Sequence, residues 1–216
     1  MIQAVIFDMD GLLVDSEPVW FRARVELLAR FGKQWTASDQ EPLMGVSTAT
    51  WVDYVTEKLE GAMPPDEVLR KVVSIMAAAY EGGDVPLLPG ASEALEHCVG
   101  SYRVGLASGS PKRLINAALT GAGLHRFFEE VVTSDECARG KPAPDVYLEI
   151  MNRMGLSPDT TAVVEDSAAG ILAGKAAKAK VIAVPQSFVS TDSEALAQAD
   201  ARLESLYELP NVLLKL

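Results

Sequence analysis

Residues 4–11 (AVIFDMDG) constrain the fold of this 216-residue chain more than any other stretch. Residues 4–7 form a short apolar run, which predicts a fully buried strand. Asp8 and Asp10 follow this strand directly. In an extended backbone, residues two positions apart point to the same side, about 6.5 Å from each other. Both acids are therefore expected in one crevice beyond the carboxyl end of a strand, where open α/β sheets bind ligands.

An acid pair this close is unfavourable unless something compensates its charge. A metal ion, a shared proton or a cationic group would do so. Gly11 follows Asp10 and permits a sharp turn that a residue with a Cβ would resist. Taken alone, this short pattern is also compatible with a strand that ends in solvated acids.

Composition excludes several classes of protein. The formal net charge is −11, from 30 acidic and 19 basic residues, which disfavours nucleic acid as a partner. No run approaches the roughly 18 apolar residues of a membrane span, and no basic-then-apolar leader opens the chain. We expect a cytoplasmic monomer with no membrane partner. Cys98 and Cys137 lack metal-type spacing and are expected to be reduced thiols.

The pattern between residues 18 and 80 is helical throughout. Apolar spacing and turn residues predict helices over 18–31, 47–59 and 65–80. From residue 87 the pattern changes to alternating strands and helices, with strands predicted over 103–107, 130–133, 161–164 and 181–184. Such alternation predicts parallel strands with right-handed crossovers. The expected fold class is α/β, a Rossmann-like parallel-sheet core with an inserted all-helical block.

Polar residues follow several of these predicted strands. Ser108 ends the second strand, Glu165 and Asp166 end a later one, and Lys141 lies in a loop after the third strand of this half. Each alone has an ordinary explanation, as a turn residue, a helix-capping acid or a surface lysine. Together, the acids would repel by several kcal/mol unless a divalent cation and a basic group offset them. Oxygen ligands of this kind suit Mg²⁺.

Four stretches resemble the ordered motifs of the haloacid dehalogenase-like hydrolase superfamily. They are residues 8–11 (DMDG), Ser108 after residues 104–107 (VGLA), residues 140–142 (GKP) and residues 163–167 (VVEDS). The helical block resembles the C1-type cap of that superfamily. The resemblance implies a catalytic core of residues 1–15 and 86–216, and a cap of residues 16–85 that sets the substrate.

The resemblance also implies a role for each motif residue. Asp8 would attack phosphorus and form an aspartyl-phosphate. Asp10 would protonate the leaving oxygen and then activate the hydrolytic water. Ser108 would hydrogen-bond a phosphoryl oxygen, and Lys141 would offset negative charge on Asp8 and on the transferring group. The Mg²⁺ ligands would be Asp8, Asp10 through its backbone carbonyl, Glu165 and Asp166.

The substrate is expected to be a small phosphorylated metabolite, such as a sugar or polyol phosphate. Glu17 is a candidate to hydrogen-bond a sugar hydroxyl, although an acid in a first helical turn is also favoured by the helix dipole. Trp20 is expected in the core of an amphipathic helix. The candidate substrate-binding residues are Gly11, Leu12, Glu17, Ser108, Gly109 and Lys141.

A phosphomutase resembling β-phosphoglucomutase is the nearest alternative, because its cap matches this one in outline. That enzyme holds a second phosphate with a basic residue where this chain has Thr48, and has a histidine where this chain has Trp20. Both differences favour hydrolysis. Arg22, Arg24 or Arg70 would have to supply the missing charge.

Two further alternatives are weaker. Haloalkanoate dehalogenases of the superfamily replace the second aspartate of the first motif, which is present here as Asp10. A receiver-type signalling domain also gathers acids, a hydroxyl and a lysine around Mg²⁺, but places its phospho-acceptor later in the chain. A lid of some sixty residues excludes water from bound substrate, which is a feature of enzymes.

Overall fold

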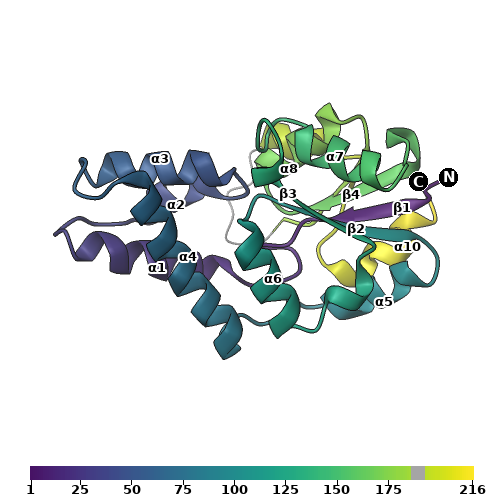
Figure 1. Cartoon of the computed structure of the whole chain (residues 1–216). Coiled ribbons are helices and arrows are strands. Elements are labelled where there is room, and N and C mark those ends of the chain that lie inside the picture. Colours follow the sequence, from purple (N-terminus) through teal and green to yellow (C-terminus); the bar gives the residue numbers. More distant parts are fainter. Residues whose placement is uncertain (186–192) are drawn as a thin grey trace.

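The computed structural model describes residues 1–185 and 193–216. Within these residues, six strands form one sheet in the order β3-β2-β1-β4-β5-β6 (Figure 1). All neighbouring strands are parallel, and β1 lies between β2 and β4. The residues that follow β1 therefore lie near the middle of the edge at which the carboxyl ends of the strands meet. The strands are β1 (Ala4–Phe7), β2 (Arg103–Ser108), β3 (Glu130–Thr133), β4 (Thr161–Glu165), β5 (Lys180–Ala183) and β6 (Ala201–Arg202).

Helices cover both faces of the sheet, which explains why its strands are apolar on both sides. Val5 and Phe7 pack into one hydrophobic cluster with residues of α5, α6 and α10, whereas Ile6 packs into a second cluster with residues of α7 and α8. Figure 1 shows these two groups of helices on opposite sides of the sheet. The helices of this lobe are α5 (Ala91–Val99), α6 (Lys112–Gly121), α7 (Asp145–Arg153), α8 (Ala168–Ala176), α9 (Ser193–Gln198) and α10 (Leu209–Leu213).

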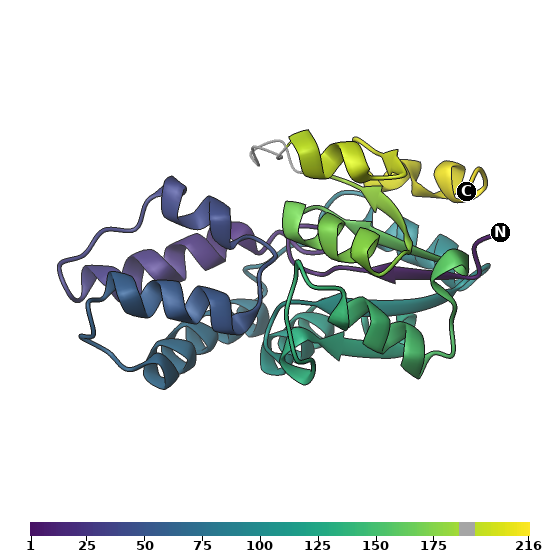
Figure 2. The same ribbon diagram turned by 90° about the horizontal axis from the view of Figure 1, so that it is seen from above.

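Four helices between β1 and β2 form a separate lobe, the cap (Figures 1 and 2). Its core is aromatic: the Trp20 and Trp51 ring centroids lie 5.6 Å apart, and those of Trp35 and Tyr54 lie 5.8 Å apart. The predicted α/β fold, a parallel-sheet core with an inserted helical cap, is confirmed. The cap helices are α1 (Glu17–Ala29), α2 (Ala37–Gln40), α3 (Thr48–Lys58) and α4 (Pro65–Gly82).

The short helix α2 was not predicted from the sequence. It is a single turn held by a capping box, in which the Asp39 carboxylate accepts hydrogen bonds from the Thr36 N–H (2.8 Å) and hydroxyl (2.6 Å). No helix among residues 1–185 and 193–216 is both long and apolar enough to cross a membrane. The 3-10 turns are η1 (Glu41–Leu43), η2 (His125–Phe127), η3 (Ser134–Glu136), η4 (Pro158–Thr160) and η5 (Leu206–Glu208).

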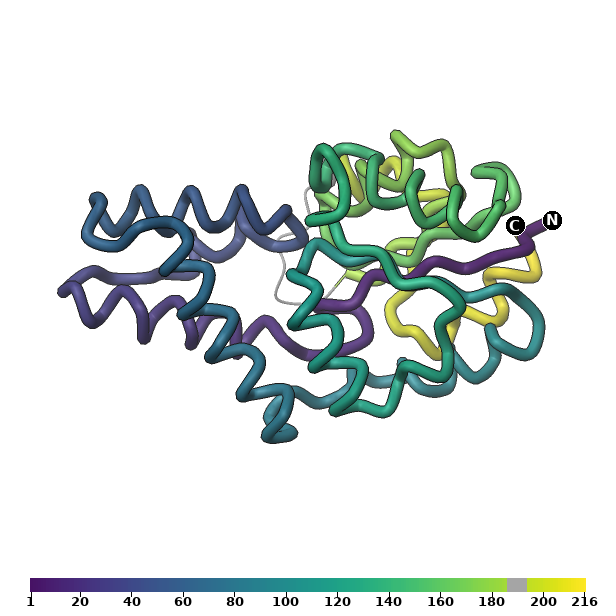
Figure 3. The backbone as a smooth tube through the Cα atoms, in the orientation of Figure 1, coloured from purple at the N-terminus to yellow at the C-terminus, as the bar shows by residue number. Residues whose placement is uncertain are grey.

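Two neighbouring backbone segments connect the lobes. The Asp15 N–H donates to the Pro86 carbonyl at 2.9 Å, and the Leu88 N–H donates to the Leu13 carbonyl at 2.9 Å. In Figure 3 the chain can be followed from β1 into the cap and back through α4 toward α5. The cap also lies against the carboxyl edge of the sheet, where the Thr48 hydroxyl donates to the Gly109 carbonyl at 3.4 Å, and α4 packs against α6.

The C-terminal segment, which the sequence did not place, completes the core. Leu203, Leu206, Leu209 and Leu213 are buried in the cluster that also contains Val5 and Phe7. The η5 turn and α10 pack on α5.

Candidate active site

The polar residues predicted at the strand ends meet at one edge of the sheet. The last residue of β1 is in register with residues near the ends of both β2 and β4. Asp8 therefore follows β1 next to the end of β2, at Ser108, and the end of β4, at Glu165. Asp166 comes directly after Glu165. The convergence expected for parallel strands is confirmed.

Lys141 is the central cation of this edge. Its Nζ lies 2.6 Å from Asp8 Oδ1 and 2.6 Å from Glu165 Oε1, and donates to the Ala107 carbonyl at 3.3 Å. The Tyr147 hydroxyl donates to the same Glu165 oxygen at 2.5 Å. The Lys141 side chain is 0% exposed. Lys141 is therefore not a surface lysine. Its ammonium joins two carboxylates in a buried hydrogen-bond network.

Burial and charge shift the pKa values in this network in opposite directions. Burial raises the pKa of Asp8 to about 8, although the ammonium of Lys141 lowers it. Burial alone would lower the pKa of Lys141, but the charges of Asp8 and Glu165 raise it well above its usual value. The lysine is therefore cationic, and the site contains more acid than this one cation balances.

Three buried carboxylates form an acidic cluster that fits a divalent cation. Oxygen atoms of Asp8, Glu165 and Asp166 all lie within 4.8 Å of one another. Burial, followed by the neighbouring acids Glu165 and Asp8, raises the pKa of Asp166 well above its usual range. A donor set made only of carboxylate oxygens suits a hard cation such as Mg²⁺. The Asp10 side chain is not a member of this cluster, and its predicted backbone contact to the metal stays a prediction.

Gly11 makes room for one member of the acidic cluster. Its φ is +76°, and a Cβ at this position would lie 2.2 Å from Asp166 Oδ2. Both the backbone conformation and the close approach exclude larger residues. The sharp turn expected after Asp10 thus brings Asp166 against the first motif.

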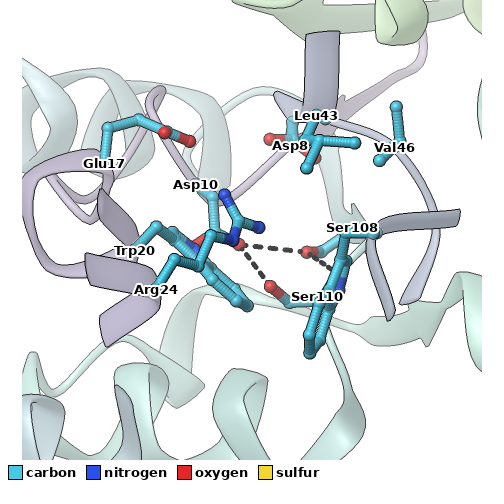
Figure 4. A pocket seen from close by; sticks show the side chains of 12 residues that line it. Asp8, Asp10, Glu17, Trp20, Arg24, Leu43, Val46, Ser108 and Ser110 are labelled. Atoms are coloured by element: carbon cyan, nitrogen blue, oxygen red, sulfur yellow. Dashed lines mark hydrogen bonds between the residues drawn. The ribbon is translucent and has the colours of Figure 1, made fainter. Parts of the chain in front are cut away.

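The Asp10 carboxylate is held by hydrogen-bond donors from both lobes. Its Oδ1 accepts from the Ser16 hydroxyl (2.7 Å), the Tyr80 hydroxyl (2.9 Å) and the Trp20 indole N–H (3.3 Å). Its Oδ2 accepts from the Ser110 hydroxyl at 2.8 Å (Figure 4). Asp10 is therefore oriented by the cap on one side and by the loop after β2 on the other.

All four of these donors have roles that the sequence did not reveal. Ser16 precedes α1 and Ser110 lies just before α6, but neither hydroxyl caps a helix, and both donate to Asp10. Trp20 is buried as expected, yet its ring edge reaches the same carboxylate. Tyr80 had been placed only at the end of a predicted helix. No local motif marks a side chain that becomes functional through a distant contact.

A small cavity separates the cap from the carboxyl edge of the sheet. Its free volume is about 30 Å³, which holds roughly two water molecules. A sugar phosphate is larger than this free volume. The lining residues are Asp8, Asp10, Glu17, Trp20, Arg24, Leu43, Gly45, Val46, Trp51, Ser108, Gly109 and Ser110.

Three of the six predicted substrate-binding residues do not line the cavity. Gly11, Leu12 and Lys141 are buried beside the cavity but do not line it. Leu12 packs into the hydrophobic core, Gly11 packs against Asp166, and Lys141 points at Asp8. The other three predicted residues, Glu17, Ser108 and Gly109, do line it.

Fold and site together define a capped α/β enzyme with an acid-rich active site. The model of the family described as "Haloacid dehalogenase-like hydrolase" matches residues 5–184. The chain belongs to the haloacid dehalogenase-like hydrolase family, as its four motifs predicted.

Several relatives match nearly the whole chain. Hexitol phosphatase B of Escherichia coli (strain K12) is 35% identical over 212 residues, which are 96% of this chain and 94% of that protein. The phosphorylated carbohydrates phosphatase of Thermotoga maritima is 33% identical over 219 residues, 98% of each chain. The crystal structure of CbbY from Rhodobacter sphaeroides in complex with phosphate superposes with a TM-score of 0.85 at 25% identity, and the match covers 97% of this chain and 96% of that one. The chain is therefore similar to sugar and polyol phosphatases along its full length.

Proposed function

We propose that this enzyme is a Mg²⁺-dependent phosphatase that hydrolyses a sugar or polyol phosphate through an aspartyl-phosphate intermediate. One observation carries the proposal. Asp8, paired with Lys141, and Asp10, held by hydroxyl and indole donors, line the same cavity beneath the cap. The full-length similarity to a hexitol phosphatase and a phosphorylated carbohydrates phosphatase supports the substrate class.

Asp8 is the nucleophile in this proposal. Its carboxylate oxygen attacks phosphorus, the ester P–O bond breaks, and the phosphoryl group remains on Asp8 until water displaces it. Lys141 favours the ionised form of Asp8 and offsets charge on the transferring group. Ser108, at the end of β2, donates its hydroxyl to a phosphoryl oxygen.

Asp10 is the general acid and base. When protonated it gives its proton to the departing alkoxide, and as a carboxylate it later takes a proton from the attacking water. Its donors from Ser16, Tyr80, Trp20 and Ser110 keep it in one orientation for both steps.

The acidic cluster of Asp8, Glu165 and Asp166 would hold Mg²⁺, with the backbone carbonyl of Asp10 as a further ligand. When bound, the ion supplies positive charge that neutralises the phosphoryl oxygens. Glu165 is shared with Lys141 and Tyr147, so Asp166 is the cluster member with most freedom to bind the ion.

Hydrolysis is favoured over the mutase alternative by the charges of the cap. A mutase must hold a second phosphate there. Arg22 pairs with Asp84 on the surface, and Arg70 is exposed and donates to a carbonyl of its own helix. Of the three arginines considered, Arg24 reaches the cavity, but Glu17 lines the same wall and would repel a second anion.

Phosphate release from a panel of sugar and polyol monophosphates, with Mg²⁺ present, tests the proposal. We expect release from a subset of hydroxylated monophosphates. A parallel assay follows conversion of β-glucose 1-phosphate to glucose 6-phosphate with a bisphosphate primer. Isomerisation without net release would overturn hydrolysis as the function.

The acidic net charge of −11 supports a small-molecule partner rather than a nucleic acid. A monomeric state and a cytoplasmic location remain predictions from the sequence.

A further inference from the structure

A chain of hydrogen bonds in the cap ends at the cavity. The Oε1 of Gln40, the last residue of α2, accepts hydrogen bonds from Arg24 Nη1 at 2.7 Å and from Trp35 Nε1 at 3.1 Å. Guanidinium and indole nitrogens can only donate. The amide oxygen must therefore face them, which turns the amide nitrogen toward Glu17. Gln40 Nε2 donates to Glu17 Oε2 at 2.8 Å.

Aromatic rings fix the far end of this chain. The guanidinium carbon of Arg24 lies 4.9, 5.5 and 5.6 Å from the ring centroids of Trp20, Trp35 and Trp51. These distances are typical of cation–π contacts. Arg24 is 2% exposed, and its buried Nε has no hydrogen-bond partner among the residues that the structure describes. Such an enclosed cation leaves Gln40 a single favourable orientation.

Glu17 connects this series of hydrogen bonds to the cavity in which Asp8 and Asp10 lie. It lines the same cavity as Asp8 and Asp10 (Figure 4). Burial raises the pKa of Glu17, whereas the Gln40 hydrogen bond and the charge of Arg24 lower it; Asp10 and Asp15 raise it further. Gln40 donates to Oε2 of Glu17, so Oε1 of Glu17 remains available to accept a hydrogen bond from a ligand.

We propose that Gln40 and Arg24 are positioning residues that hold Glu17 as an acceptor for a substrate hydroxyl, so that the cap selects phosphate esters of hydroxylated chains over unhydroxylated alkyl phosphates. This inference rests on the proposed phosphatase function. Glu17 and Arg24 carry opposite charges, so this part of the wall suits a neutral hydroxyl rather than a second anion. A ligand without the hydroxyl leaves Glu17 Oε1 without a hydrogen-bond donor in the cavity, and sites built to bind a hydroxyl strongly reject ligands that lack it.

Steady-state kinetics on two substrates test the inference. Phosphate release is followed with a hexitol 6-phosphate and with hexyl phosphate, which has the same carbon chain without hydroxyls. The unmodified enzyme should prefer the hexitol ester by at least about a hundredfold in kcat/KM. Gln40→Met keeps the side-chain length but loses both hydrogen-bonding groups. It should raise KM for the hexitol ester roughly tenfold with little change in kcat, and leave hexyl phosphate turnover unchanged.

Two further variants keep the test decisive. Glu17→Gln retains the shape of the side chain and should give the same selective rise in KM, even if Gln40→Met does not fold. Lys33→Met removes an ion pair with Glu60 in the cap. Neither residue lines the cavity, so the kcat and KM for both substrates should stay unchanged.

The inference is overturned if Gln40→Met and Glu17→Gln affect both substrates equally, lower kcat rather than raise KM, or have no effect. A different result defeats the proposed function itself. If the unmodified enzyme releases phosphate from neither ester nor from any member of the wider panel, the function fails and the inference fails with it.

Discussion

The two walls of the active-site cavity differ in the kinds of side chain that form them. The core wall, together with the residues directly behind it, gathers three carboxylates and one buried ammonium at the ends of parallel strands. The cap wall is mostly uncharged, with Trp20 and Trp51 beside one acid and one arginine. The core wall has the charge density that phosphoryl transfer requires. The cap wall has close to zero net charge, and we infer that it selects the substrate.

This contrast separates chemistry from selectivity. Changes in the core wall should lower turnover of every substrate, because they remove groups that act on the phosphoryl group itself. Changes in the cap wall should depend on which substrate is used. Asp10 belongs to both walls, since its donors come from the cap and from the loop after β2.

Asp8→Asn should have the largest effect. Removal of the nucleophile should lower kcat by about 10⁴-fold or more with every substrate. Thermal stability should change little, because Lys141 keeps its ion pair with Glu165 and the amide has the same shape as the carboxylate. Phosphate release and the melting temperature measure both effects. Turnover within tenfold of the unmodified enzyme would refute the assignment of Asp8.

Removal of the metal should come next in size. Dialysis against a chelator should lower activity by about a thousandfold, since the charge on the phosphoryl group loses its main compensation. Added Mg²⁺ should restore the rate. Full activity of the metal-free protein, checked by elemental analysis, would contradict the role given to the acidic cluster.

Lys141→Met tests the core wall through stability. This change leaves Asp8 and Glu165 buried without their cation, and should lower the free energy of unfolding by about 3–5 kcal/mol. The matched control is Lys112→Met, which breaks an ion pair with Glu136 at a lysine that is 66% exposed. The control should cost less than about 1 kcal/mol. Urea denaturation compares the two variants, and equal losses would show that the Lys141 network is not special.

Tyr80→Phe tests the cap's hold on Asp10 and should have the smallest effect. One of the hydrogen bonds to Asp10 is lost, so kcat should fall about tenfold with the fold intact. Tyr54→Phe is the control, because its hydroxyl donates to Asp39, which does not line the cavity. Should both variants behave alike, Tyr80 would be only a packing residue.

The core half of the site was predictable because its logic is local. Each acid follows an apolar run that reads as a strand, and parallel strands bring their carboxyl ends together. The sequence therefore indicated Asp8, Asp10, Ser108 and the Glu165-Asp166 pair as neighbours. It also indicated Lys141, and the resemblance implied that this lysine would offset the charge of Asp8, against which its ammonium lies.

The cap half was not predictable to the same extent. Tyr80 lies 70 residues from Asp10 in the chain, and helical periodicity shows only that such a residue faces the interior. Gln40 depends on α2, a single turn too short to give a periodic signal. Arg24 was considered only as a cation, because nothing in the sequence reveals that three tryptophan rings enclose it.

The most direct test of this account is to locate the phosphoryl group during turnover. Enzyme and a hexitol phosphate are mixed with Mg²⁺, quenched in acid within milliseconds, and digested for peptide mass spectrometry. The account predicts a phosphoryl group on the peptide that contains Asp8, which forms before free phosphate appears and is absent from Asp8→Asn. A phosphoryl group on any other side chain, or phosphate release by Asp8→Asn at the normal rate, would contradict it.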